Sequence, residues 1–475
     1  MQAFVADSLS VPAASGKLRV AGALGSVIFF SLLVLLVITA LPYGTREAWW
    51  KALFVCAVFT LAILWLVEGY LSHTWIKDGR GVILPLLALA IFSVIQTIHF
   101  PLATSLPGGI TPVPWNAISV DPYQTRFFAL QIFSLILAAV FLFNYANTEK
   151  RWRILINLII GVAVASAIFG IVRRTTQHDT GFVLPLIKLE QGYGQFINRN
   201  HFAFMMEAAL GLGLGMTIGG GVRRDQALIY FAALMPIWTA LVLSGSRAGL
   251  IAMLAQVIVA ALLFSLATRK RDSDSESRVV QIMRSRAVQV SLVVVLLFGI
   301  VLGTLWLGGN DLASRIAESR SDLSSETDYG RRAVSRNDIW KLTLRMIAAN
   351  PIVGVGMGAY WASVPTFHDG SGQMTPQEAH NDYLEVIASG GIVGLAILVW
   401  FVIVVLRKTR ENLRASHRFR RAACFGAAIG ITGMAVHSLV DFGLHAMINA
   451  LIFIALVVMV TAKPPWATER IRETI

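Results

Sequence analysis

The chain has 475 residues, of which 56% are hydrophobic and only 14% are charged, and its mean hydropathy is +0.67. Soluble domains carry roughly 25% charged residues, so this composition excludes an ordinary soluble globular protein. The formal charge of +13 indicates the positive-inside bias of a membrane protein rather than binding to nucleic acid.

The first long apolar stretch, 20–41, exceeds the roughly 7–15 apolar residues of a signal peptide and lacks a small-residue cleavage site. It is therefore predicted to span the membrane. The expected fold is all-α, a polytopic membrane protein of about twelve transmembrane helices, because a span needs about 20 mostly apolar residues. The predicted spans are 20–41, 50–71, 81–99, 126–146, 153–173, 199–219, 226–243, 248–267, 289–308, 383–406, 422–441 and 445–462.

The distribution of positive charge predicts the topology. With the N-terminus inside, more than half of the 40 Lys and Arg residues fall on the cytoplasmic side, as the positive-inside rule requires. Residues 1–19 and 463–475 are then cytoplasmic tails, 20–308 carry the first nine helices, and 383–462 carry the last three. The segment 309–382 is left as one long periplasmic loop.

Part of this loop is predicted to be helical. Ser335 is a candidate N-cap with Asp338 three residues later, apolar residues follow at helical spacing, and Asn350 and Pro351 end the helix. Such a helix can rest on the membrane surface or close over a cavity. Ordered loops of this length are uncommon unless they are functional.

Two arginines on the outer side lie beside predicted helix starts. Arg199 leads into the sixth span, and Arg247 lies in a tight turn, Ser244–Gly249, between two spans. Helix starts offer free N–H groups and a positive dipole end, and guanidinium groups bind phosphate through paired donors. The site would suit a pyrophosphate, whereas capping and snorkelling are the structural alternatives. The candidate substrate-binding residues here are Asn198, Arg199, Asn200, His201 and Arg247.

A third polar segment ends the long loop and enters the tenth span. His380 is a candidate general base because the unperturbed pKa of histidine is near ~6.5. Asp382 or Glu385 could orient it, and all three are candidate catalytic residues, with Asn381 as a substrate-binding neighbour. The glycines that follow, Gly390, Gly391 and Gly394, allow close approach of another backbone.

Other polar groups on the outer side carry weaker signals. His437 and Asp441 stand four residues apart near the end of the eleventh span, with His445 beyond, and form either a functional pair or a packing pair. Glu207, two turns into the sixth span, could pair with an arginine. The segment Gly354–Gly358 lacks the strand context of a nucleotide-binding loop and is predicted to be a turn.

The sequence also lacks several chemical motifs. Cys56 and Cys424 both lie within apolar stretches, which argues against a disulfide framework or a cysteine-based zinc site. No metal-binding or Walker motif is present. The chemistry is therefore expected to need no metal ion, no ATP and no cofactor.

These segments resemble a known family. His380 and Asn381, followed by Gly391 and Gly394, are similar to the signature of the bacterial O-antigen ligase and Wzy-type polymerase superfamily. Further similar blocks are Asn198–His201, Ser244–Gly249, Trp340–Gly358 and His437–Asp441. The resemblance covers residues 196–445 by motif and the first five spans only by hydropathy.

The resemblance implies a membrane glycosyltransferase with a GT-C-like fold in the bacterial inner membrane. Its donor would be a glycan on undecaprenyl pyrophosphate at the periplasmic face, with Arg199 and Arg247 holding the pyrophosphate. His380 would activate an acceptor hydroxyl, on lipid A–core in a ligase or on a growing polysaccharide in a polymerase. The shared blocks do not separate ligase from polymerase.

Two other classes of protein stay open. Buried charges in a helical bundle also mark transport paths, so a transporter or a flippase for lipid-linked glycans is the main alternative. The lack of repeated halves and the gathering of polar segments on one face argue against it. An assembly scaffold would leave the arginine and histidine segments without a role.

Overall fold

The computed structural model describes residues 11–76, 78–99, 117–176, 192–268, 336–368 and 376–467. Within these ranges the ordered elements are α-helices and two short 3-10 turns, and no β-strand occurs among them. The all-α prediction is confirmed for the described part of the chain.

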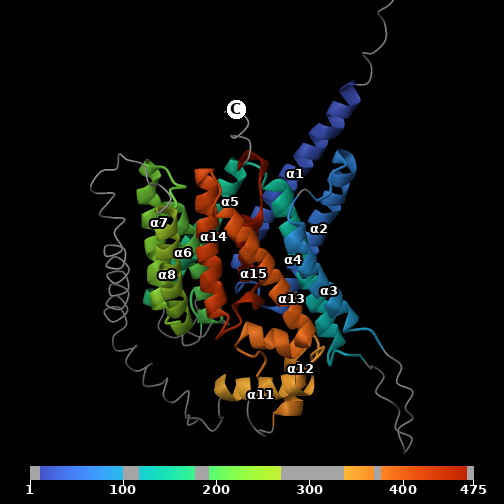
Figure 1. Ribbon diagram of the computed structural model, residues 1–475. Coiled ribbons are helices and arrows are strands. Elements are labelled where there is room, and N and C mark those ends of the chain that lie inside the picture. Colours follow the sequence, from blue (N-terminus) through green and yellow to red (C-terminus); the bar gives the residue numbers. More distant parts are fainter. Residues whose placement is uncertain are drawn as a thin grey trace, which may run out of the picture.

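Most described residues lie in a bundle of long helices, with two shorter helices, α11 and α12, across one end (Figure 1). In chain order the elements are α1 (Val11–Ala40), α2 (Ala48–Ser72), α3 (Arg80–Ile95), α4 (Pro122–Tyr145), α5 (Glu149–Thr176), α6 (Arg199–Ile218), α7 (Arg224–Leu243), α8 (Arg247–Thr268), α11 (Arg336–Ala349), α12 (Tyr360–Phe367), α13 (Asp382–Asn412), α14 (Arg418–His437), η1 (Gly443–His445), α15 (Met447–Thr461) and η2 (Pro465–Ala467).

Seven described helices, α1, α2, α4, α5, α6, α7 and α13, are long and apolar enough to cross a membrane, and α3, α8 and α15 carry shorter apolar segments. Every predicted span except 289–308 overlaps a described helix, and 289–308 lies outside the described residues. The chain is therefore an integral membrane protein by the length and composition of its helices. The total of about twelve spans and the GT-C-like architecture stay predictions.

The helix predicted in the long loop is confirmed as α11, and its proposed cap, Ser335, lies outside the described residues. α11 buries Ile339, Leu342 and Met346, which is the apolar face that the spacing predicted. The segment Gly354–Gly358 is a turn with its three glycines at positive φ, also as predicted. α12, the short helix after this turn, was not predicted.

α6 and α14 pack with their backbones in close contact. A Cβ atom added to Gly211 would collide with the backbone of Gly430, and one added to Gly215 would collide with Gly426. Small residues allow helices in membranes to approach this closely. Because α6 starts at Arg199 and α14 ends at His437, this contact brings the polar start of α6 beside the polar end of α14.

α13 is interrupted at Gly391, whose φ of 59° and ψ of −154° suit glycine alone. A turn from the long loop fills the interruption. The N–H of Val355 donates to the carbonyl of Ala388 at 3.0 Å, and the N–H of Ile392 donates to the carbonyl of Pro351 at 2.9 Å. Irregular backbone in a membrane protein needs such internal partners. The close backbone approach predicted for this glycine segment is confirmed at Gly391, where an added Cβ would collide with the backbone of Ile352 and Val353.

The two ends of α14 define the two ends of the bundle used below. The end that carries α11, α12 and the start of α13 is called the His380 end, because His380 directly precedes Asn381, the N-cap of α13. The other end is called the Arg420 end, after the buried arginine in the first turn of α14. The predicted site residues all belong to the His380 end.

Candidate active site

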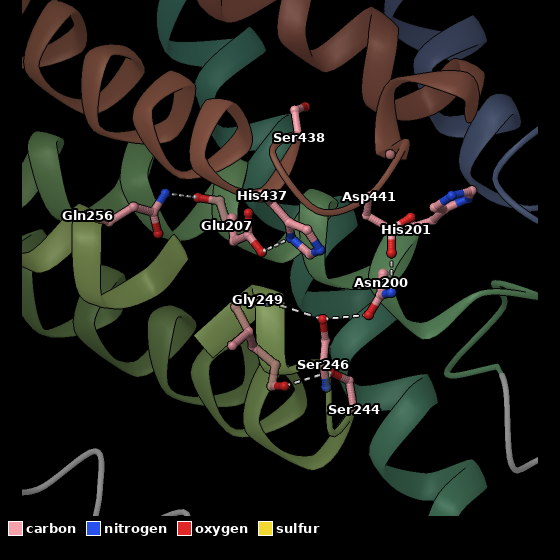
Figure 2. Close-up of polar contacts among 12 residues, drawn as sticks. Asn200, His201, Glu207, Ser244, Ser246, Gly249, Gln256, His437, Ser438 and Asp441 are labelled. Atoms are coloured by element: carbon pink, nitrogen blue, oxygen red, sulfur yellow. Dashed lines mark hydrogen bonds and ion pairs between the residues drawn. The ribbon is translucent and has the colours of Figure 1, made fainter. Parts of the chain in front are cut away.

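Two helix starts that carry arginine are joined by a hydrogen bond at the His380 end. Asn198 caps α6 by accepting from the N–H of Asn200 at 2.8 Å, and α8 starts at Arg247. The hydroxyl of Ser246 donates to the side-chain oxygen of Asn200 at 2.7 Å, as Figure 2 shows. The predicted Arg199 and Arg247 segments are therefore neighbours, and both arginine side chains are partly buried.

Asp441 connects these helix starts to the rest of the site. Its buried carboxylate accepts a short hydrogen bond from the amide of Asn200 (Figure 2). The same carboxylate accepts from the backbone N–H of Phe442 at 2.8 Å and from the guanidinium of Arg336 on α11 at 3.4 Å. Its Oδ1 lies 4.0 Å from Nδ1 of His380. Four separate segments of the chain thus meet at one carboxylate.

His380 lies in the loop before α13 in an unusual conformation. Its φ of 50° is positive, which is uncommon for any residue other than glycine. Its side chain is 31% exposed. Burial lowers its pKa from the ordinary 6.5, and Arg336 and Arg46 lower it further, while Asp441 opposes them. The imidazole is therefore neutral at neutral pH, as a general base must be.

Asp382 and Glu385 do not take the positions expected for them. The prediction was that one of them orients His380, but both face His445, whose Nε2 lies 3.8 Å from Asp382 and 3.4 Å from Glu385. Asp382 also accepts from the hydroxyl of Ser438 at 2.7 Å. The carboxylate that faces His380 is Asp441, which belongs to a different segment.

Asn381 is a structural residue of the loop and of α13. Its side-chain oxygen accepts from the N–H groups of Tyr383 and Leu384, both at 3.0 Å, which makes it the N-cap of α13. Its amide nitrogen donates to the carbonyl of Leu439 at 2.8 Å. The side chain predicted to bind substrate therefore ties the start of α13 to the turn that carries Asp441.

Glu207 and His437 form a buried pair between α6 and α14 (Figure 2). Nδ1 of His437 lies 2.7 Å from the Glu207 carboxylate. The amide of Gln256 on α8 donates to the backbone carbonyl of Glu207 at 2.8 Å. The sequence suggested that Glu207 could pair with an arginine, but its carboxylate pairs with His437, because the close α6–α14 contact places these two side chains opposite each other. His437 and Asp441 stay in contact through the backbone, where the N–H of Asp441 donates to the carbonyl of His437 at 3.1 Å.

Arg46 and Glu378 are charged residues of the site that the sequence did not single out. Arg46, in the turn between α1 and α2, donates to Glu378 at 3.0 Å, and its guanidinium lies 5.4 Å from the centroid of the Phe442 ring. Burial raises the pKa of Glu378, and Arg46 opposes that shift. The sequence did offer a signal for Arg46, because the positive-inside bias disfavours arginine on the outer side of the membrane.

His201 packs against Phe442 and is buried. Its ring makes an edge contact with the Phe442 ring, at 4.9 Å between centroids. Its backbone carbonyl accepts from the amide of Asn449 at 2.9 Å. The residue predicted to bind substrate is thus packed in the protein interior.

A family model described as O-antigen ligase matches residues 231–399. This confirms the resemblance inferred from the sequence motifs, and the matched region contains Arg247, Arg336 and His380. Asn200 and Asp441 lie outside it, but Asn200 bonds to Ser246 within the matched region, and Asp441 faces Arg336 and His380. No curated protein matches the chain.

Proposed function

From the O-antigen ligase match over residues 231–399 and the geometry around Asp441, we propose that this chain is a membrane glycosyltransferase. It transfers a glycan from undecaprenyl pyrophosphate to an acceptor hydroxyl, on lipid A–core or on a growing polysaccharide. The reaction takes place at the periplasmic face of the bacterial inner membrane. The observation that carries the proposal is the Asp441 carboxylate, which joins His380 to the two helix starts that carry arginine.

His380 is the general base of the proposed reaction. Because Nδ1 faces Asp441 at 4.0 Å, Nε2 is the nitrogen left to accept the proton of the acceptor hydroxyl. As that proton leaves, the hydroxyl oxygen forms a bond to the anomeric carbon of the donor. The bond from that carbon to the pyrophosphate breaks, and its electron pair stays on the phosphate oxygen.

Arg199 and Arg247 stabilise the leaving group in this proposal. Negative charge grows on the pyrophosphate in the transition state, so cations held in place lower the barrier more than they tighten donor binding. Each arginine is the first residue of its helix, where the positive end of the helix dipole also favours an anion. The protein's own arginines supply the charge that the reaction needs, and we expect activity in the presence of chelator.

Asp441 is proposed to orient His380 and to stabilise the imidazolium that forms. The 4.0 Å separation is longer than a hydrogen bond, and catalytic hydrogen bonds are often long until substrate is bound. Asn200 and Arg336 fix the other oxygen of the carboxylate. Asp441 therefore takes the role that the sequence gave to Asp382 and Glu385.

Labelling of single cysteines tests the proposed orientation. Lys341 is exposed on α11, and Arg410 is exposed near the end of α13. With Cys56 and Cys424 replaced, cysteine at position 341 should react with an impermeant reagent added from the periplasm, and cysteine at position 410 should not. The opposite pattern would put the His380 end in the cytoplasm and refute a periplasmic reaction.

Deletion of the gene tests the reaction class and separates ligase from polymerase. Loss of a ligase leaves bare lipid A–core while lipid-linked polymer accumulates, whereas loss of a polymerase leaves single repeat units on gels of surface glycans. An unchanged glycan profile would contradict both.

A further inference from the structure

The ring of Phe442 lies among four polar groups of the candidate site. Its centroid is 4.8 Å from that of His380 and 5.5 Å from that of His445. It also contacts His201, at 4.9 Å between centroids, and the guanidinium of Arg46, at 5.4 Å. The side chain is 2% exposed. Nothing in the proposed reaction requires an aromatic ring at this place.

His380 needs support from outside its own backbone. The left-handed conformation at φ 50° is sparsely populated and persists only where the surroundings hold it. Nδ1 makes no hydrogen bond to any described residue. Within the described part of the chain, packing rather than hydrogen bonding therefore holds the imidazole in place. The ring that packs against it there is that of Phe442.

Phe442 also controls the position of the carboxylate. It directly follows Asp441, and its backbone N–H donates to Oδ1 of Asp441 at 2.8 Å. This is the same oxygen that faces His380. One residue thus holds the carboxylate with its backbone and touches the imidazole with its ring. A shift of the ring would change the distance between the two groups.

We infer, on the basis of the proposed glycosyl transfer, that Phe442 is a positioning residue for the reaction. Its ring holds the His380 imidazole beside the Asp441 carboxylate, so that Nε2 is free to meet the acceptor hydroxyl. The ring also keeps water from one face of the imidazole.

The charged and titratable groups around His380 fix the expected direction of the pH effect. Asp441 faces it from the turn after α14, Arg336 from α11, Arg46 from the α1–α2 turn and His445 from η1. Burial is the largest cause of the lowered pKa of His380. A smaller side chain in place of the Phe442 ring admits water, so the pKa of His380 should rise towards 6.5.

The chain offers a matched control at its other end. Phe419 is 3% exposed, and the guanidinium of Arg153 lies 4.1 Å from the centroid of its ring. Phe419 thus shares its burial and its arginine contact with Phe442, but it lies at the Arg420 end. Phe442→Leu and Phe419→Leu remove the same ring from two similarly buried positions.

The test compares these variants, purified in lipid nanodiscs, by two measurements. The first is the pH dependence of glycosyl transfer from the lipid-linked donor. The second is the rate at which diethyl pyrocarbonate modifies His380, followed by mass spectrometry across the same pH range. The second measurement needs no substrate and reports the neutral fraction of the imidazole.

For Phe442→Leu we expect kcat to fall about 10–100-fold, because a displacement of about 1 Å can cost 10²-fold. The KM for the donor should change less than about twofold, since donor binding is assigned to the arginines. The midpoints of transfer and of His380 modification should both move to higher pH. Phe419→Leu should match the wild type in kcat, in KM and in the pH midpoints. If Phe442→Leu does not fold, Phe442→Met is measured in its place.

The outcomes separate this inference from the proposed function. If Phe442→Leu matches Phe419→Leu in kcat and in the pH dependence of His380 modification, the ring is structural and the inference is wrong. The proposed function would then still stand on His380. If His380→Ala keeps wild-type transfer, the general base lies elsewhere, and if the wild type transfers no glycan, the proposed function itself is wrong.

Discussion

The two ends of α14 use buried polar groups in different ways. At the Arg420 end, the guanidinium of Arg420 donates to the carbonyls of Met459 at 2.8 Å and of Ala462 at 2.5 Å and lies over the ring of Trp152. At the His380 end, buried nitrogens of His201, His380 and His437 have no hydrogen-bond partner among the described residues.

The two ends differ in the kind of buried nitrogen that stays unpaired among the described residues, which is the indole of Trp466 near Arg420 and histidine near His380. Buried polar groups are nearly always satisfied in folded proteins, so each exception asks for an explanation. Arg420 satisfies the carbonyls at the end of α15, where a helix leaves acceptors unpaired. At the other end, the unpaired Nδ1 of His380 lies 4.0 Å from the Asp441 carboxylate, which is the arrangement that the proposed orientation of the imidazole uses. Substitutions at the two ends test this difference.

His380→Ala should have the largest effect on activity. Loss of a general base costs about 10²–10⁴-fold in rate, and binding of the lipid-linked donor should persist because the arginines are assigned to it. Transfer and donor binding are measured on the purified variant. His417→Ala, at the Arg420 end, is the control and should keep wild-type activity per folded molecule. Equal activity of His380→Ala and His417→Ala would contradict a catalytic role for the His380 end.

Arg199→Ala and Arg247→Ala should each cost about 2–4 kcal/mol of transition-state stabilisation, as the loss of a donor to a developing anion does. Lysine should restore only part of the rate, because a point charge cannot reproduce the paired donors of a guanidinium. kcat/KM for transfer is the measurement, and Arg153→Ala at the Arg420 end is the control. An alanine variant that folds and keeps full activity would show that its arginine is structural.

Asp441→Asn should slow transfer about 100-fold by misplacing His380, and it should also shift the pH profile. In the wild type, transfer needs neutral His380 and is lost as the pH falls through its lowered pKa. Asp441 raises that pKa, so removal of its charge should move the acidic limb to lower pH. Phe442→Leu should move the limb to higher pH. Shifts of both variants in one direction would contradict the assigned contacts.

Arg420→Met should have the smallest effect on activity and a clear effect on stability. The apolar side chain leaves the carbonyl of Met459 without the Arg420 donor and the carbonyl of Ala462 with only the longer bond from the Asn412 amide, at 3.4 Å. An unsatisfied buried group costs about 1–3 kcal/mol. Thermal unfolding measures the loss, and transfer per folded molecule should stay at the wild-type level. A catalytic defect without a loss of stability would mean that the Arg420 end also takes part in the reaction.

The sequence predicted the helix starts well and the partners of the site residues poorly. The helix starts at Arg199, at Arg247 and after Asn381 follow from local signals, namely caps, turns and apolar runs. The approach of Asp441 to His380 depends on how separate segments pack, and the spacing of residues along the sequence does not predict it.

Helical periodicity misled for a physical reason. His437 and Asp441 are four residues apart, which would place them on one face of a helix. α14 ends at His437, and Asp441 follows in a turn. Its N–H still donates to the carbonyl of His437 at 3.1 Å, but its carboxylate bonds to Asn200 and Arg336. The groups that meet the Asp441 carboxylate come from α6, from α11 and from the loop before α13. Glu207 could be assigned to His437 only once the glycine contact between α6 and α14 was seen.

Reconstitution of the purified protein with a lipid-linked glycan donor and an acceptor glycan shows whether the chain forms a glycosidic bond. Mass spectrometry follows both products in vesicles that contain chelator. We predict that the wild type forms the glycosidic bond and releases one undecaprenyl pyrophosphate for each bond, and that His380→Ala does neither. Movement of intact donor across the bilayer without bond formation, equal in both proteins, would contradict the account and identify a flippase.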